Sequence, residues 1–268
     1  MLDYHLHLWP HGQQAEGPTL EQVAAYCEAA GREGVTEVAL TEHLFRFRQA
    51  DRLLRGFWAD EPDPALASSM ARYWDDHVGA DLDAYVSCAL AAKDAGLPVV
   101  LGLEVDYYRD RMEEVAALLE GYPFDVLLGS VHWIGTWRFD DLDDEVSMAH
   151  WSTRSVDEVW DAYTVALEEL AATATCDVLA HPDLVKVIGK QPGAPDDWWD
   201  RMVEAARSSG MAAELSSAGW RKPVGEQYPA LGLLQRFVAA GVPLTTASDA
   251  HRLGDVAQRS TELRGLLR

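Results

Sequence analysis

Seven short apolar runs recur along the chain, and each run ends in residues that can bind a metal ion. The runs are residues 4–7, 38–43, 99–104, 126–132, 178–181, 211–214 and 244–251. Continuous apolar runs of this length are typical of parallel strands that are buried on both faces. The pattern therefore predicts seven buried parallel strands.

Segments long enough for helices separate these runs, with an apolar residue at every third or fourth position. Residues 156–170 show this period most fully. Ser155 followed by Glu158 predicts a capping box, and glycines such as Gly34 and Gly210 stand where helices commonly end. Because parallel strands joined by helices need right-handed connections, seven such units predict an α/β fold, a distorted seven-stranded (β/α)7 barrel.

Two longer stretches, about residues 44–75 and 135–154, interrupt the repeat, and we expect them to be irregular. Both follow strand ends that carry candidate ligands, so they would overhang a site there as lids or substrate walls. Five tryptophans in or beside them could form an aromatic wall, but packing of the long loops is favoured for most. These are Trp58, Trp74, Trp133, Trp137 and Trp151.

Composition narrows the class of protein. The 268 residues are 48% hydrophobic and contain no linker-like stretch, which predicts a single domain over residues 1–268. No apolar stretch could span a bilayer and no signal peptide is evident, so we expect a cytoplasmic protein without a membrane partner. The net charge of −22 argues against nucleic-acid binding. The sequence does not indicate an oligomeric state.

The three cysteines do not suggest a disulfide framework or a thiolate zinc site. Cys27, Cys88 and Cys176 are far apart and odd in number. We expect them to be small core residues.

Histidines and carboxylates at the strand ends predict a shared metal site. His5 and His7 are two residues apart on a predicted strand, so both imidazoles point to one face. The carboxyl ends of parallel strands meet at one edge, where α/β folds bind ligands. The further candidates at that edge are His43, Glu104, His132, His181, Asp249 and His251.

The type and number of these ligands indicate the chemistry. Imidazole and carboxylate ligands without cysteine favour Zn, Mn or Fe. The set is too large for one tetrahedral ion, which predicts two to three divalent ions, with a carboxylate such as Glu104 bridging two of them. Closely spaced ions are the usual apparatus for splitting phosphate esters. The residues therefore predict hydrolysis of a phosphate ester, and together with the resemblance described next they predict a small-molecule phosphate monoester as the substrate.

At these positions the sequence resembles the polymerase-and-histidinol-phosphatase (PHP) superfamily, and in particular its histidinol-phosphatase branch. The resemblance follows the family's order over nearly the whole chain, and residues 219–229 resemble a signature specific to that branch. The matching stretches are DYHLH at 3–7, TEH at 41–43, LGLEVDYY at 101–108, GSVHW at 129–133, AHPDLVK at 180–186, ELSSAGWRKPVGEQYP at 214–229 and SDAH at 248–251.

The resemblance implies a distorted seven-stranded barrel of the PHP type, with three metal ions at the carboxyl ends of its strands. The first ion would be held by His5, His7, Glu104 and Asp249, the second by His11, His43 and His251, and the third by Glu104, His132 and His181. Three positions depart from the family pattern. His11 follows His7 by four residues where many relatives have six, Glu42 replaces an aspartate, and Ser216 replaces an asparagine.

Further residues are candidates for contacts with the substrate and for proton transfer. Glu104, Asp249 and His251 belong to the predicted catalytic centre. Asp183, or one of the ligand histidines, could protonate the leaving alkoxide. Glu42 and Asp106 would orient histidines. In a chain this acidic, a few cations could hold the phosphate, and the candidates are Arg221, Lys222, Arg46 and Lys186.

Three functions agree with these residues. The branch signature and the length favour an L-histidinol-phosphate phosphatase of histidine biosynthesis. The same metal site could instead act on a nucleotide or sugar phosphate. A third hypothesis is a non-catalytic metal-binding module, but the near-complete ligand set argues against it.

Overall fold

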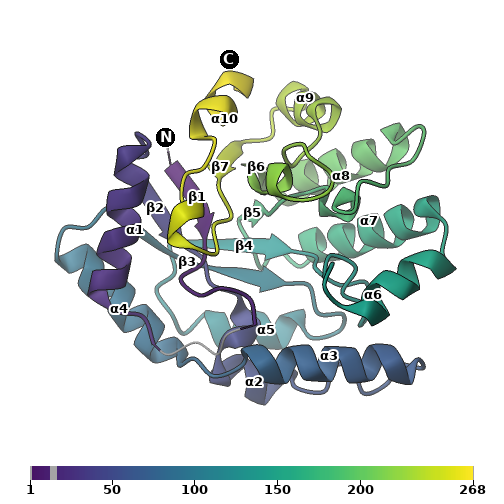
Figure 1. The fold of residues 1–268 in the computed structure, drawn as a ribbon, viewed down its shortest axis with the longest axis horizontal. Coiled ribbons are helices and arrows are strands. Elements are labelled where there is room, and N and C mark those ends of the chain that lie inside the picture. The colour runs from purple at the N-terminus through teal and green to yellow at the C-terminus, as the bar shows by residue number, and fades with distance from the viewer. Residues whose placement is uncertain (1, 13–16, 268) are drawn as a thin grey trace.

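The computed structural model describes residues 2–12 and 17–267, and in them seven parallel strands form one sheet in sequential order, β1 to β7 (Figure 1). The predicted fold class is confirmed. Every neighbouring pair of strands is parallel. The strands are β1 (Leu2–Leu6), β2 (Glu37–Leu40), β3 (Val99–Asp106), β4 (Val126–Ser130), β5 (Val178–Leu179), β6 (Ala212–Ser216) and β7 (Leu244–Ala247).

The sheet closes into a barrel where the first strand meets the segment that follows the last one. Leu6 forms a parallel bridge with Ala250, and the N–H of His7 donates to the carbonyl of Ala250 at 2.7 Å. The N–H of Asp249 donates to the carbonyl of His5 at 2.8 Å. The closure therefore lies at the strand ends that carry the candidate ligands.

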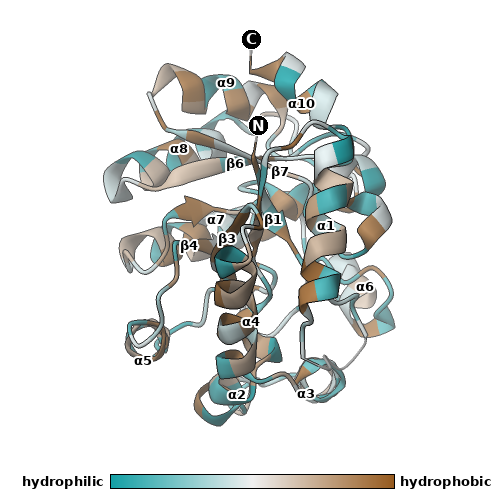
Figure 2. Ribbon diagram, turned by 90° about the vertical axis from the view of Figure 1, so that its left-hand side faces the viewer, coloured by the Kyte–Doolittle hydropathy of each residue, from teal (hydrophilic) through white to brown (hydrophobic). Residues whose placement is uncertain are grey.

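Ten helices surround the sheet within the described residues. Figure 2 shows hydrophobic strand segments in the interior and helices such as α1 that carry both hydrophobic and hydrophilic segments, as expected for helices packed on a core. The helices are α1 (Leu20–Arg32), α2 (Arg48–Leu54), α3 (Pro64–His77), α4 (Leu82–Asp94), α5 (Met112–Leu119), α6 (Glu145–His150), α7 (Val156–Ala172), α8 (Asp196–Ser209), α9 (Leu231–Ala239) and α10 (Ser260–Leu266).

The predicted helix boundaries at two places are confirmed. Ser155 and Glu158 form a reciprocal capping box at the start of α7. The residue that ends α8, Gly210, has a φ of 76°, a left-handed conformation that glycine adopts without steric cost.

The expectation that residues 44–75 are irregular is wrong. This stretch contains a 3₁₀ turn (Leu44–Arg46), α2 and most of α3. Asp63 caps α3 directly before Pro64, and Leu66, Met70 and Trp74, spaced four residues apart, are buried. These are ordinary helix signals, so the segment is an additional helical layer. The other insertion, 135–154, is also partly helical, with α6 and a 3₁₀ turn at Trp151–Thr153.

The tryptophans of the insertions mainly pack into the core, as expected. Trp74, Trp133, Trp137 and Trp151 are buried, and Trp58 is partly buried against the same core. The three cysteines are unpaired, with Cys27 and Cys176 buried. Among the helices that the structure describes, none has the length and apolarity needed to cross a membrane.

The strands end earlier than the apolar runs that predicted them. His43 follows the last residue of β2 by three positions, and His132 and His181 follow β4 and β5 by two. His181 and Asp249 have positive φ values, 28° and 50°. At these ends the backbone has left the regular strand geometry, and the ligand side chains project from the turns.

Candidate metal centre

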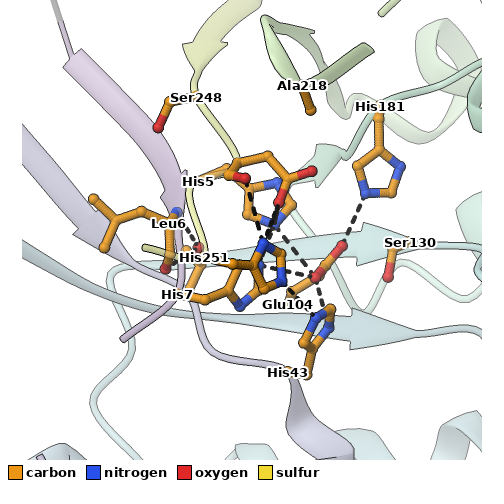
Figure 3. Close-up of polar contacts among 12 residues, drawn as sticks. His5, Leu6, His7, His43, Glu104, Ser130, His181, Ala218, Ser248 and His251 are labelled. Carbon is orange, nitrogen blue, oxygen red and sulfur yellow. Dashed lines mark hydrogen bonds and ion pairs between the residues drawn. The ribbon is translucent and has the colours of Figure 1, made fainter. Parts of the chain in front are cut away.

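Nine residues with metal-binding atoms gather at the carboxyl-terminal mouth of the barrel. Figure 3 shows how the labelled members of this set converge on Glu104, namely His5, His7, His43, His181 and His251. Within each of four groups of three residues, the ligand atoms lie within 4.8 Å of one another. The groups share members, so they form one continuous cluster. They are His7, His43 and His251; His5, Glu104 and His181; His5, His7 and Asp249; and His43, Asp106 and His132.

Glu104, which β3 carries, lies in the middle of this cluster, and its two oxygens face different histidines. Oε2 lies 2.7 Å from His43 Nδ1 and 3.3 Å from His5 Nε2. Oε1 lies 3.0 Å from His181 Nε2 and 3.5 Å from His132 Nε2. A carboxylate whose oxygens are divided in this way can bridge two adjacent metal ions.

The histidine nitrogens approach one another as ligands of a cation would. His5 Nε2 lies 3.1 Å from His7 Nε2, and His251 Nε2 lies 3.4 Å from His43 Nε2. Nδ1 of His5 donates to Glu214, so the Nε2 of this ring presents a lone pair to a cation once the imidazole is neutral. Buried imidazole and carboxylate donors converging in this way suit Zn, Mn or Fe. The residues present therefore fit the predicted ions.

Two carboxylates orient histidines of the cluster by contacting the ring nitrogen that faces away from Glu104. Glu214 Oε2 accepts a hydrogen bond from His5 Nδ1 at 2.8 Å, and Asp106 Oδ1 accepts one from His132 Nδ1 at 2.6 Å. Such contacts fix the tautomer and the direction of a ligating imidazole. The sequence predicts this role for Asp106, whereas it marks Glu214 only as the carboxylate that ends the apolar run 211–214.

Glu42 connects a cluster histidine to Arg46. Its Oε2 lies 3.6 Å from His7 Nδ1 and 3.4 Å from Arg46 Nε. Arg46 is fully buried, and its Nη2 donates to the carbonyls of Trp9 and Pro10 at 3.3 and 3.2 Å. These contacts hold the segment that follows β1.

The charges of the cluster affect its ligands differently. Against the effect of burial, nearby carboxylates raise the pKa of His5 well above its usual value and that of His132 to about 10, so metal binding at these two residues would release protons. Burial alone would raise the pKa of Glu104, but the nearby His5, His43 and His132 hold this pKa well below its usual value. Burial lowers the pKa of His251 well below its usual value. The Glu104 carboxylate is thus ionised and the His251 imidazole neutral near pH 7, and both are ligand forms.

A cavity of about 620 Å³ opens beside the cluster. His132 and His11 line it, together with two of the predicted substrate cations, Arg221 and Lys222. The insertion after β4 adds carboxylates to the wall. A cavity of this size, next to converging polar groups, can hold a small charged molecule. The wall residues from that insertion include Asp140, Asp141, Asp143 and Asp144.

The signature segment brings Arg221 against the end of β7. Arg221 Nη2 donates to the carbonyls of Ser248 and Asp249 at 2.7 and 2.8 Å. Arg221 thus touches the backbone of a candidate ligand while it lines the cavity. The neighbouring Lys222 is exposed at the cavity wall.

Lys186 and Asp183 lie in a different setting. Lys186 is fully buried, with Nζ 3.0 Å from Asp183 Oδ2 and 2.8 Å from Glu226 Oε1. Asp183 Oδ2 also accepts the N–H of Ala230 at 2.7 Å. These contacts join the loops after β5 and β6. The described residues that line the cavity do not include Lys186, Asp183 or Arg46, although the sequence predicts that these three contact the substrate or transfer a proton.

His11 lies at the edge of the cluster. Its ring stacks on that of His251, with 4.1 Å between the ring centroids, and it lines the cavity. Among the described residues, the groups of closely spaced ligand atoms do not include His11. Its role as a ligand stays a prediction.

Sequence reasoning missed two residues at the cavity, Arg138 and Asp140. Arg138 is buried and donates to Ser69 Oγ at 2.7 Å. The available signal was weak: two charged residues flank the apolar Phe139 inside a polar insertion. Nothing in their spacing connects them to the strand ends, because the folding of the insertion brings them there.

Comparisons with known proteins agree with this geometry. The PHP domain family matches residues 5–218. A Deinococcus radiodurans protein named "Probable histidinol-phosphatase" is 30% identical over 260 residues, covering 97% of this chain and 89% of its own. A Bacillus subtilis protein named histidinol-phosphatase is 28% identical over 276 residues, covering 95% of this chain and 94% of its own.

Two solved structures share the fold. A candidate histidinol phosphatase of Listeria monocytogenes superposes with a TM-score of 0.76 at 17% identity, covering 98% of this chain and 99% of its own. The histidinol phosphate phosphatase of Lactococcus lactis, solved with zinc, L-histidinol and phosphate, gives a TM-score of 0.67 at 19% identity, covering 99% and 93%. With its seven-stranded barrel, its cluster of histidines and carboxylates and these matches, the chain belongs to the PHP domain family.

Proposed function

We propose that this protein is a metal-dependent phosphomonoesterase that hydrolyses L-histidinol phosphate to L-histidinol and phosphate. The observation that carries the proposal is the division of the two Glu104 oxygens between separate sets of buried histidines, beside a cavity lined with charged side chains. The names of the two relatives and the histidinol and phosphate bound in the Lactococcus structure support this substrate.

The ligand assignment follows the resemblance to the family. We assign His5, His7, Glu104 and Asp249 to a first ion and His43 and His251, with His11, to a second. A third ion would be held by His132, His181 and the other oxygen of Glu104. Zinc in the Lactococcus relative supports Zn, with Mn and Fe equally compatible with the donor set.

When bound, such ions would neutralise charge on the phosphoryl oxygens and lower the pKa of water toward neutrality. The chain itself would bind the ester in the cavity, where Arg221 and Lys222 add positive charge. Glu214 and Asp106 would hold the His5 and His132 rings in their ligand orientation. The hydrogen bonds of Arg221 would keep the Asp249 backbone in place.

We also propose a cytoplasmic location, in keeping with three unpaired cysteines, since disulfides are rare in reducing compartments.

The decisive experiment is phosphate release by the purified protein loaded with Mn or Zn, across histidinol phosphate, nucleoside monophosphates and sugar phosphates. We expect metal-dependent turnover with the highest kcat/KM on histidinol phosphate, and none after treatment with EDTA. A profile led by a nucleotide would retain the chemistry and reject the substrate. Turnover that survives complete metal removal would reject the mechanism.

A further inference from the structure

The carboxylates that line the cavity differ in what they contact. Asp141 and Asp144 both pair with the buried Arg138, so their charge is balanced within the insertion. Asp144 also caps α6 by accepting the N–H of Ser147. These two carboxylates have structural partners.

Asp140 differs from them. Its side chain lines the cavity and is only partly exposed, and within the described residues it has no hydrogen-bond or ion-pair partner. Asp76 and Asp143 also line the cavity but are exposed to solvent. Asp140 is therefore the sheltered carboxylate of this wall that is available to a ligand.

The backbone before Asp140 is firmly held. Phe139 is fully buried, and its carbonyl accepts a hydrogen bond from Trp151 Nε1 at 2.8 Å. The preceding Arg138 is fixed by Ser69 and by the two aspartates. A carboxylate on such a support is preorganised, so a ligand would not have to order it on binding.

Asp140 also lies beside the metal centre. Its charge acts on His132, a candidate metal ligand, and on Lys222, a cation of the cavity wall. The Asp140 side chain thus lines the same cavity as His132 of the cluster and as Arg221 and Lys222 of the positive wall. A substrate with an anionic group close to a cationic group would match this arrangement, with the anionic group at the metal cluster and the cationic group at Asp140.

Histidinol phosphate has such a structure, because its amine is attached to the carbon next to the one that bears the phosphate ester. With the phosphate at the metal cluster, the ammonium would lie a short distance into the cavity. We propose that Asp140 binds this ammonium group and makes the site selective for phosphate esters of 2-amino alcohols. The inference rests on the proposed function, because it assigns the position of that substrate's amine.

The test compares two substrates that differ only in the amine. These are histidinol phosphate and 3-(imidazol-4-yl)propyl phosphate, assayed with the metal-loaded wild type, with Asp140→Asn and with Glu145→Gln. The last variant removes one exposed charge from the same insertion without touching the cavity wall. Bound metal per chain and the melting temperature are measured for every protein.

We expect Asp140→Asn to lower kcat/KM for histidinol phosphate by about 10- to 100-fold, mainly through KM, since a sheltered charge-assisted hydrogen bond is lost. The analogue without the amine should be hydrolysed equally by the wild type and by Asp140→Asn. Metal content should be unchanged, and Glu145→Gln should match the wild type on both substrates.

Equal losses on both substrates, or a loss of bound metal, would overturn the assignment and make Asp140 a positioning residue for His132. If Asp140→Asn fails to fold, the wild type still decides: it should prefer histidinol phosphate to the analogue by the same factor, and equal kcat/KM values would reject the inference. Wild type that hydrolyses other phosphate esters but not histidinol phosphate would reject the proposed substrate and this inference together.

Discussion

Glu104 is the residue on which the proposed metal centre depends most, because its carboxylate contacts histidines on both sides. We expect Glu104→Gln to lower kcat/KM by at least about a thousandfold and to reduce the bound metal, since a neutral amide binds cations poorly. Phosphate-release assays and metal analysis of the purified variant test this. The exposed Glu113→Gln is the matched control and should behave as wild type. Wild-type metal content together with wild-type turnover in Glu104→Gln would refute the assignment.

A second prediction at the residue scale concerns acid stability. Burial lowers the pKa of His77 to about 4, whereas an unfolded histidine titrates near 6.5. Between these values the unfolded chain takes up a proton that the folded protein does not. Stability that is fully present above pH ~6.5 therefore declines as the pH falls toward 4, by roughly 3 kcal/mol in total.

His77→Gln should remove this contribution. Its amide can replace the hydrogen bond that His77 Nε2 accepts from the N–H of Gly12. Urea unfolding at pH 7 and pH 5 should show an acid loss that is smaller in the variant by roughly 2 kcal/mol. Identical losses in both proteins would contradict the prediction.

At the same scale, the cluster residues could be predicted because each follows a buried apolar run, and the ends of parallel strands meet. The surroundings of the predicted substrate-binding cations could not be predicted from the sequence. Arg46 and Lys186 also follow ligand strands in the sequence, yet their side chains turn to backbone carbonyls and to Glu226 inside the protein. The path of the loop determines the direction in which each of these side chains points, and no local sequence pattern predicts that path.

At the scale of elements, the loop after β6 depends on Gly219. A Cβ at this position would overlap the carbonyl oxygen of Glu226 and lie 3.1 Å from the Tyr228 ring. Gly219→Ala should therefore destabilise the protein by on the order of 2 kcal/mol and raise KM by displacing Arg221. Gly31→Ala, in α1, meets nothing within 4 Å and should be neutral or stabilising by up to about 1 kcal/mol. Urea unfolding compares them, and equal stabilities would contradict the expected clash.

The order and type of the main elements were predictable because burial gives strands and helices different periods. The region 44–75 differs from the expectation of an irregular segment, which rests on the fact that ligand-bearing strand ends in α/β folds are usually followed by loops. The helical spacing of Leu66, Met70 and Trp74 indicates a helix there instead. Cap and spacing signals therefore deserve more weight than position in the repeat.

At the scale of the whole molecule, metal binding should contribute to stability. Ions that bind only the folded state stabilise it by RT ln(1 + [L]/Kd), about 4 kcal/mol at a thousandfold excess over Kd. Removing them with EDTA should lower the melting temperature by about 10 °C. Differential scanning calorimetry of the loaded and stripped protein tests this, with Glu104→Gln expected to show a smaller difference. An unchanged melting temperature after verified metal removal would contradict it.

The closure of the barrel between His7 and Ala250 has a consequence for biosynthesis. His5 and His7 are synthesised first, whereas Asp249 and His251 follow only after the intervening strands and helices of the barrel. A nascent chain therefore carries exposed histidines throughout synthesis without the carboxylate that completes their site. The complete set of ions can bind only after residue 251 has left the ribosome. Metal loading therefore depends on the ions that are available once that part of the chain has been synthesised.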